Sequence, residues 1–111
     1  MLEKLSKDYV RCFDARDLKG VGALLNEDFS LKDPNLNISG KAACLEAIAG
    51  IFSSHKSLEF VAQNIFVDET QMTSLIEFTL KLDALVLEGV VLIKWQDGKM
   101  SALRAYLNPK S

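Results

Sequence analysis

The chain has 111 residues, of which 49% are hydrophobic and 25% are charged, and its formal net charge is -2. This length fits one domain with a core of its own, and the composition is too apolar for a disordered chain. Lys and Arg are scattered along the sequence and form no run. We therefore expect no nucleic-acid partner, because such partners are usually met by a clustered basic patch.

No segment is typical of export or of membrane insertion. Residues 1–5 lack the apolar core of a signal peptide, and the apolar stretch at 85–93 is too short to span a bilayer as a helix. Cys12 and Cys44 fall at apolar helical positions without CxxC spacing, which favours buried, reduced thiols and a cytoplasmic location. With one His and two distant Cys we expect no metal site, and we expect no cofactor.

Two helices are predicted at the start of the chain. Residues 2–16 carry apolar side chains at spacings near three and four, which is typical of an amphipathic helix. Asp17 is a candidate N-cap for a second, shorter helix, because its carboxylate can accept from the backbone N–H of Lys19 or Gly20.

A strand at 29–33 and a turn at 35–37 should follow, with Pro34 holding Asp33 in an extended conformation. Ser39 is then the expected N-cap of a third helix that reaches Ser54. The residues that this helix should bury are Ala42, Leu45, Ile48, Ala49 and Phe52.

Beyond His55 the hydrophobic period changes to two. We predict strands at 57–67, 71–82, 85–95 and 99–107, with a tight turn at Asp83-Ala84 and a hairpin signal at Asp97-Gly98. Helices followed by consecutive antiparallel strands indicate an α+β fold. The face of strand 71–82 expected to meet the helices consists of Met72, Ser74, Ile76, Phe78, Leu80 and Leu82.

The opposite face of strand 85–95 is also apolar, since it offers Val86, Val90 and Leu92. An apolar face that would otherwise meet water indicates that something covers it. We expect a second copy of the chain there, with a C-terminal segment or a curl of the sheet as the alternatives.

Several short motifs occur in a distinctive order. They are the segment from Tyr9 to Phe29 followed by Lys32-Asp33-Pro34, the helix entry Ser39-Gly40-Lys41, and the hairpin 89–99 followed by Arg104-Ala105-Tyr106. Their order resembles the nuclear transport factor 2-like superfamily, of the SnoaL-like and ketosteroid isomerase-like type. The resemblance implies one domain over residues 1–111. Three N-terminal helices would pack in a strongly curved, mixed but mainly antiparallel sheet, a cystatin-like cone with an internal apolar cavity.

The resemblance also implies residue roles. Asp33, which precedes Pro34, matches the general base of ketosteroid isomerases, and Tyr9 matches the Tyr that donates to the developing oxyanion. Val91 stands where those enzymes carry a second, protonated Asp. Loss of one oxyanion donor costs on the order of 10²- to 10³-fold in rate, so we expect no efficient steroid isomerisation. The residues predicted to line a ligand pocket are Phe60, Asn64, Met72, Phe78, Val91 and Trp95.

Each of these residues also has a purely structural interpretation. Asp33 would be a turn carboxylate bonded to nearby backbone N–H groups, and Tyr9 would fill core volume. His55 ends the third helix, where the helix dipole favours an imidazolium. Arg104 would pair with Glu77 or Glu88 across the sheet, or would anchor an anionic ligand.

We therefore expect a SnoaL-like domain that binds a hydrophobic small molecule. If active, it would be an isomerase-, lyase- or hydrolase-like enzyme in which Asp33 acts as a general base. The alternative is a non-catalytic homodimerisation or protein-interaction module of the same fold, with the outer sheet face as its interface. A structure without a cavity above roughly 300 Å³ would favour that alternative.

Overall fold

The computed structural model describes residues 1–110. In chain order the elements are α1 (Leu2–Asp14), α2 (Leu18–Ala23), β1 (Leu25–Lys32), β2 (Asn37–Ser39), α3 (Lys41–Ser54), β3 (Leu58–Asp68), β4 (Thr73–Leu82), β5 (Leu85–Gln96) and β6 (Lys99–Pro109). The strands form one six-stranded sheet in the order β2-β1-β6-β5-β4-β3. Neighbouring strands are antiparallel except β1 and β6, which are parallel. The predicted α+β fold with a mixed, mainly antiparallel sheet is confirmed.

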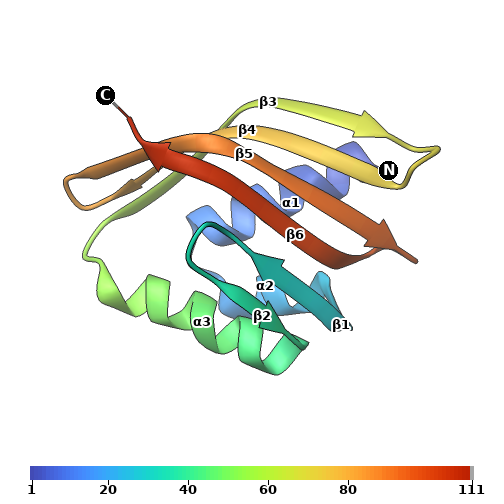
Figure 1. Ribbon diagram of the computed structural model, residues 1–111, viewed down its shortest axis with the longest axis horizontal. Coiled ribbons are helices and arrows are strands. Elements are labelled where there is room, and N and C mark those ends of the chain that lie inside the picture. The colour runs from blue at the N-terminus through green and yellow to red at the C-terminus, as the bar shows by residue number, and fades with distance from the viewer. Residues whose placement is uncertain (111) are drawn as a thin grey trace.

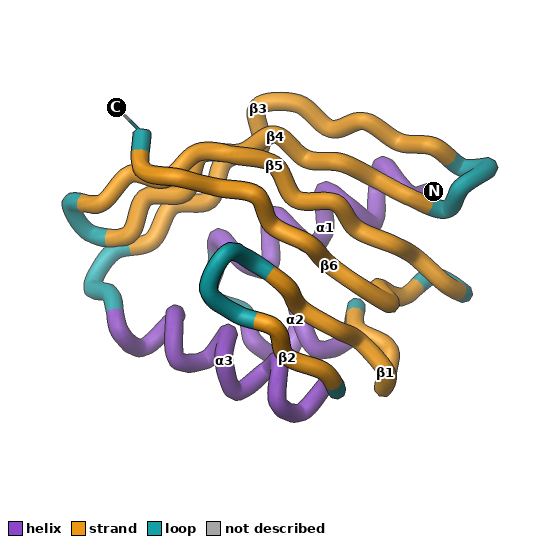
Figure 2. Tube along the Cα trace, in the orientation of Figure 1, coloured by secondary structure: helices purple, strands orange, loops and turns teal. Residues whose placement is uncertain are grey.

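The sheet curves over the helices (Figure 1). Helix α1 packs against β3 and β4, while α3 packs against β1 and β2 on the other side of the fold (Figure 2). The concave face of the sheet and the inner faces of α1 and α3 together enclose the core.

Helix α1 buries Leu2, Ser6, Tyr9, Cys12 and Phe13. It ends two residues earlier than predicted because Arg16 takes a left-handed conformation, with φ 55°. The Arg16 guanidinium donates to the carbonyl oxygens of Phe52, His55 and Lys56 at 3.0, 2.8 and 2.9 Å, and so ties the end of α1 to the end of α3.

The predicted N-cap of α2 is confirmed, since the Asp17 carboxylate accepts from the N–H of Gly20 at 2.9 Å. The expected cap of α3 is wrong. Ser39 lies in the short strand β2, which was not predicted, and Gly40 is the N-cap with φ 95°. Helix α3 buries Cys44, Ile48 and Phe52, whereas Ala42 is exposed. Leu45 and Ala49 are half-buried.

Two of the three predicted turns are confirmed, whereas the turn expected at 35–37 lies earlier in the chain because Asn37 already belongs to β2. Asp97 and Gly98 have φ 53° and 78°, as a two-residue hairpin loop that follows the twist of its strands requires. Asp83 has φ 56° and joins β4 to β5. Met72, which was predicted to face the helices, instead lies in the turn before β4 with φ 50° and is 38% exposed.

A short chain of hydrogen bonds crosses the core. The Ser6 hydroxyl donates to the Ser74 hydroxyl at 2.8 Å, and the indole N–H of Trp95 donates to the same oxygen at 2.9 Å. All three side chains are buried, so α1, β4 and β5 share one enclosed polar contact. Cys12 and Cys44 are also buried, and both are free, as expected. Within the described residues no helix is long and apolar enough to cross a membrane.

Candidate functional site

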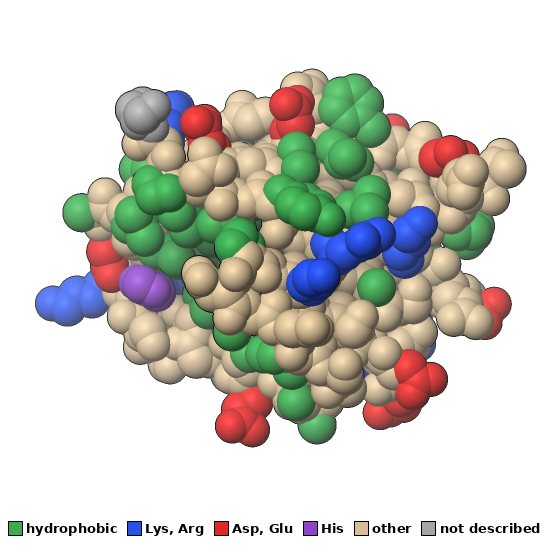
Figure 3. Space-filling model, viewed as in Figure 1, with side chains coloured by type: hydrophobic (Ala, Val, Ile, Leu, Met, Phe, Trp, Pro, Cys, Tyr) green, Lys and Arg blue, Asp and Glu red, His purple; other side chains and the backbone are tan. Residues whose placement is uncertain are grey.

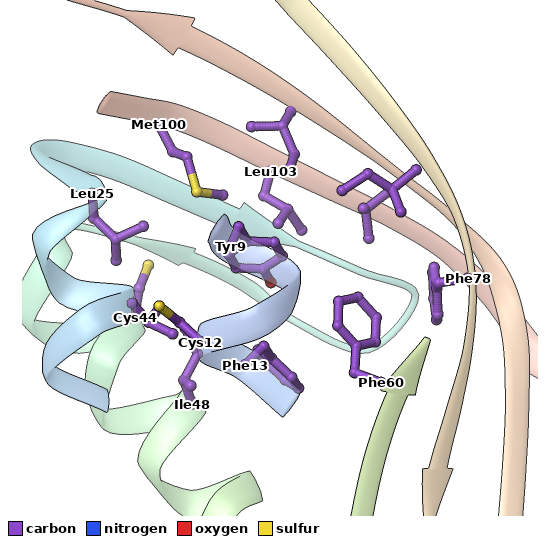
Figure 4. Close-up of a cluster of buried hydrophobic side chains, with 14 of the residues drawn as sticks. Tyr9, Cys12, Phe13, Leu25, Cys44, Ile48, Phe60, Phe78, Met100 and Leu103 are labelled. Carbon is purple, nitrogen blue, oxygen red and sulfur yellow. The ribbon is translucent and has the colours of Figure 1, made fainter. Parts of the chain in front are cut away.

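A cavity of about 250 Å³ lies between the concave face of the sheet and the helices. Its walls come from α1, α3, the β1–β2 turn and every strand except β2, and they are mostly Leu, Ile and Phe side chains (Figure 4). Among the described lining residues, only Tyr9, Asp33 and Asn35 carry polar side chains. The cavity is therefore an apolar space with very few groups that could orient a ligand.

The degree of burial along the walls locates the opening. Tyr9, Phe29, Phe60 and other deep lining residues are buried. In contrast, Leu36, Ile51, Leu87 and Leu107 are only half-buried, although they line the same cavity. The mouth thus lies between the β1–β2 turn, α3 and the adjacent ends of β5 and β6. Figure 3 shows hydrophobic side chains gathered at this end of the molecule.

Tyr9 projects from α1 into the cavity with 6% of its surface exposed. Its ring packs against Phe13 and Phe60 with centroid separations of 5.9 and 6.1 Å, and the hydroxyl points toward those rings (Figure 4). No hydrogen bond joins this hydroxyl to another group within residues 1–110. Burial raises the pKa of Tyr9 above its ordinary value, so the hydroxyl stays protonated and can donate.

Asp33 lies at the mouth, directly after β1 ends. Its Oδ1 atom accepts from the backbone N–H groups of Asn35 and Leu36, both at 2.7 Å, and so shapes the turn into β2. The predicted structural role of Asp33, a turn carboxylate bonded to nearby backbone N–H groups, is thus confirmed. The second oxygen, Oδ2, makes no hydrogen bond with the described residues and can still accept a proton.

Comparison with known proteins identifies the family of this chain. A model of the SnoaL-like domain matches residues 7–103, which is most of the chain. The chain belongs to the SnoaL-like family. The comparison with curated proteins found no match.

Solved structures of the same fold resemble this SnoaL-like domain over nearly its whole length. An NTF2-like protein of unknown function from Cytophaga hutchinsonii has a TM-score of 0.85 at 12% identity, and the match covers 97% of this chain and 90% of that one. An LEH-like epoxide hydrolase of M. tuberculosis has a TM-score of 0.78 at 17% identity, with 95% and 80% covered.

A third structure, from Catenulispora acidiphila, has a ketosteroid isomerase-like fold and is in complex with trimethylamine. It has a TM-score of 0.79 at 9% identity, with 92% and 83% covered. Identities this low establish a shared fold and leave the chemistry open.

The structure brings five of the predicted site residues of the SnoaL-like domain to one cavity. They are Tyr9, Asp33, Phe60, Phe78 and Val91. Their roles in binding or catalysis stay predictions. Since Val91 is apolar and 4% exposed, the described walls near β5 offer no second acid.

Three predicted pocket residues lie elsewhere. Met72 is in an exposed turn, and Trp95 is buried but bonded to Ser74, away from the cavity lining. Asn64 is exposed, and its side chain donates to Glu77 at 2.7 Å. The cause is a bulge between Ala62 and Asn64, which adds one residue to β3 and turns Asn64 outward.

The contribution of the last strand to the cavity was not predicted from the sequence. Leu103, Ala105 and Leu107 line the cavity from β6. Their alternate spacing in the predicted strand 99–107 was the signal that could have identified them.

His55 ends α3 as predicted, and its Nδ1 atom lies 3.0 Å from Oδ2 of Asp83. The expected pairing of Arg104 with Glu77 or Glu88 is wrong. Arg104 lies opposite Leu92, whereas Glu77 and Glu88 lie opposite Val90 and Asn108 respectively. Arg104 forms no ion pair with any of residues 1–110. In the same part of the chain, no group of three or more His, Cys, Asp or Glu could hold a metal ion.

Proposed function

We propose that this SnoaL-like domain binds a compact, mostly apolar molecule that carries one hydrogen-bond acceptor, such as a carbonyl oxygen. The observation that supports this most is the Tyr9 hydroxyl, a protonated donor without a described partner that lies against an apolar cavity. A hydrogen bond from this hydroxyl to a ligand acceptor would contribute roughly 0.5–1.5 kcal/mol to binding.

The size of the cavity restricts the ligand. At about 250 Å³ it falls below the roughly 300 Å³ of usual ligand pockets. A cavity of about 150 Å³ lined by Leu, Ile and Phe nevertheless takes up benzene. A ligand built on one ring or a short alkyl chain therefore suits this site, and a steroid does not.

Any catalysis in this proposal is proton transfer next to the carbonyl. Oδ2 of Asp33 would accept the proton, and the Tyr9 hydroxyl would donate a hydrogen bond to the enolate oxygen. The absence of an acid at Val91 predicts a slow reaction. The distinction between a binding domain and a weak isomerase thus depends on Asp33.

The test uses 4-phenylbutan-2-one, a neutral one-ring ketone. An NMR titration of the labelled protein should give shifts at the cavity residues. Tyr9→Phe keeps the ring and should weaken binding roughly three- to tenfold. The matched control is Thr70→Val, which removes a hydroxyl from an exposed side chain in the β3–β4 turn that does not line the cavity. Equal affinity in both variants would contradict the role of Tyr9.

The same samples in D₂O test for chemistry. Protein-dependent exchange of the protons next to the ketone should be lost in Asp33→Asn if Asp33 is a base. If Asp33→Asn leaves both exchange and ketone affinity unchanged, the catalytic proposal fails.

A second candidate, the non-catalytic homodimer, is favoured by the size of the cavity and by the outer sheet face. Phe66, Leu75 and Leu92 lie side by side on β3, β4 and β5, and Val90 and Tyr106 adjoin them on β5 and β6. Phe66 and Tyr106 are each 55% exposed. Such an apolar patch fits the same patch on a second copy of the chain.

Light scattering tests this interface. Leu92→Lys or Val90→Lys should convert a dimer to a monomer, because each places a charge within the patch. Gln96→Lys adds the same charge at the exposed end of the same strand and should leave the dimer intact. A Leu92→Lys protein that still scatters as a dimer would rule out this face.

A further inference from the structure

Two cationic side chains lie side by side next to the cavity mouth. Lys32 ends β1 and is the register partner of Arg104 on the parallel strand β6. Both are exposed, and neither forms an ion pair with any described residue. Lys94 projects from the same face on β5, and Figure 3 shows a band of Lys and Arg side chains there.

A hollow of about 260 Å³ adjoins this pair. It is lined by Lys32, Asp33, Pro34, Arg104, Ala105 and Tyr106. Asp33 and Ala105 also line the apolar cavity, so the hollow and the cavity border on the same two residues. The hollow exists because β1 stops at Lys32, which leaves β6 beyond Arg104 without a neighbour on that side.

The charges around this hollow do not balance. Lys32 and Arg104 contribute two positive charges and Asp33 one negative charge, which leaves one positive charge in a chain whose net charge is -2. Two adjacent cations repel each other, and a bound anion would relieve that repulsion. The planar guanidinium of Arg104 can hold a carboxylate through two hydrogen bonds.

We propose that this hollow binds the carboxylate of the ligand whose apolar body occupies the cavity. The ligand class is then a compact monocarboxylic acid, because one negative charge neutralises the excess. This inference rests on the proposed function, since it needs an occupied cavity. Arg104 and Lys32 act in binding and take no part in proton transfer.

The experiment compares 3-phenylpropionate with 3-phenylpropan-1-ol, which share a carbon skeleton and differ in charge. At low ionic strength the acid should bind the wild-type protein about tenfold more tightly than the alcohol in an NMR titration. This preference should shrink in high salt, which screens exposed charges. Arg104→Gln should remove the preference and leave alcohol affinity unchanged. Lys19→Gln, the same charge change at an exposed position on α2, should preserve it.

The possible failures are distinguishable. If the alcohol binds in the cavity and the acid binds no better, the carboxylate site is wrong and the proposed function stands. If Arg104→Gln weakens both probes equally, Arg104 acts on the fold and the carboxylate site is again wrong. If neither probe shifts the cavity residues, both proposals fail.

Discussion

His55 and Asp83 join the end of α3 to the β4–β5 turn, with 3.0 Å between Nδ1 of the imidazole and Oδ2 of the carboxylate. Oδ1 of Asp83 accepts from the backbone N–H of Ser57, also at 3.0 Å. The Ser57 N–H first, and the His55 side chain second, lower the pKa of Asp83 below its ordinary value. The end of α3, the segment before β3 and the β4–β5 turn therefore converge on one ionised carboxylate.

The first prediction concerns the pH dependence of this contact. Because the pKa of Asp83 is lower in the folded than in the unfolded chain, its stabilising effect is present above about pH 4. It is lost as the pH falls through the folded-state pKa. Asp83→Asn should therefore lower Tm near neutral pH, and its difference from wild type should shrink in acid. Thermal unfolding from about pH 7 to about pH 2 checks this, with Asp28→Asn, at an exposed position of β1, as the control. A difference that stays constant into acid would contradict the prediction.

The second prediction concerns the enclosed hydrogen bonds. Ser74→Ala leaves both the Trp95 indole N–H and the Ser6 hydroxyl without their acceptor. We expect a loss of about 1–3 kcal/mol in the free energy of unfolding. Urea unfolding followed by the fluorescence of Trp95, the one tryptophan in the sequence, measures it. Ser101→Ala removes a single bond to the Lys94 carbonyl at a half-buried position and should cost less than about 1 kcal/mol. If Ser74→Ala and Ser101→Ala lowered the free energy of unfolding equally, the enclosed hydrogen bonds would contribute no extra stability.

The third prediction contrasts two glycines. A Cβ atom on Gly89 would overlap the backbone atoms of Tyr106 and Leu107 on β6, so the two strands would have to separate. Gly89→Ala should destabilise the fold by at least ~2 kcal/mol. A Cβ atom on Gly50, exposed in α3, meets no described atom within 4 Å. Gly50→Ala should stabilise the protein by roughly 0.5–1 kcal/mol. Chemical denaturation of both variants measures the change in the free energy of unfolding. Changes of the same sign in Gly89→Ala and Gly50→Ala would contradict the prediction.

The fourth prediction places a carboxyl group in the cavity wall. Val91→Asp should cost at least ~2 kcal/mol near neutral pH, because the site is apolar and almost fully buried. Such surroundings raise the pKa of a buried carboxyl, so the folded state holds a proton more strongly than the unfolded state. The cost should therefore grow as the pH rises from about 5 to about 8. Val91→Asn, which does not titrate, should show a cost that is independent of pH. Urea unfolding at both pH values distinguishes the two variants, and parallel behaviour would place position 91 in contact with solvent.

The sequence predicted correctly those features that depend on residues close together in the chain, such as a helix cap, a hairpin turn and the alternation of one strand. The carboxylate of Asp17 caps the residues that directly follow it, and Asp97-Gly98 supplies the backbone conformation that its own hairpin needs. The inward face of β4 also follows from simple alternation, because its buried residues recur at every second position.

The errors arose where the structure depends on distant partners or on one extra residue. Gln63 is the additional residue of the β3 bulge, and it reverses the facing of Asn64 although the sequence alternation continues. Strand β1 begins at Leu25, earlier than its own pattern indicated, because its partner is β6. The position of Trp95 depends on the hydroxyl of Ser74 across the sheet.

The candidate site could be predicted only in part for the same reason. Tyr9 and Asp33 were identified through a resemblance, and the structure places both at one cavity. The cationic pair of Lys32 and Arg104 could not be foreseen as a pair, since parallel strands bring together residues whose sequence separation carries no local signal.

The parallel pairing of β1 with β6 also affects how the chain reaches its native state. Strands β1 and β2 join the sheet only through β6, which is made about 70 residues after β1. During synthesis, the hairpin of β1 and β2 and the helix α3 cannot join the sheet until residues 99–109 have left the ribosome. The hydrophobic sides of these early elements stay open in that interval, and closure of the sheet by its final strand is the step that we expect to govern the rate of folding.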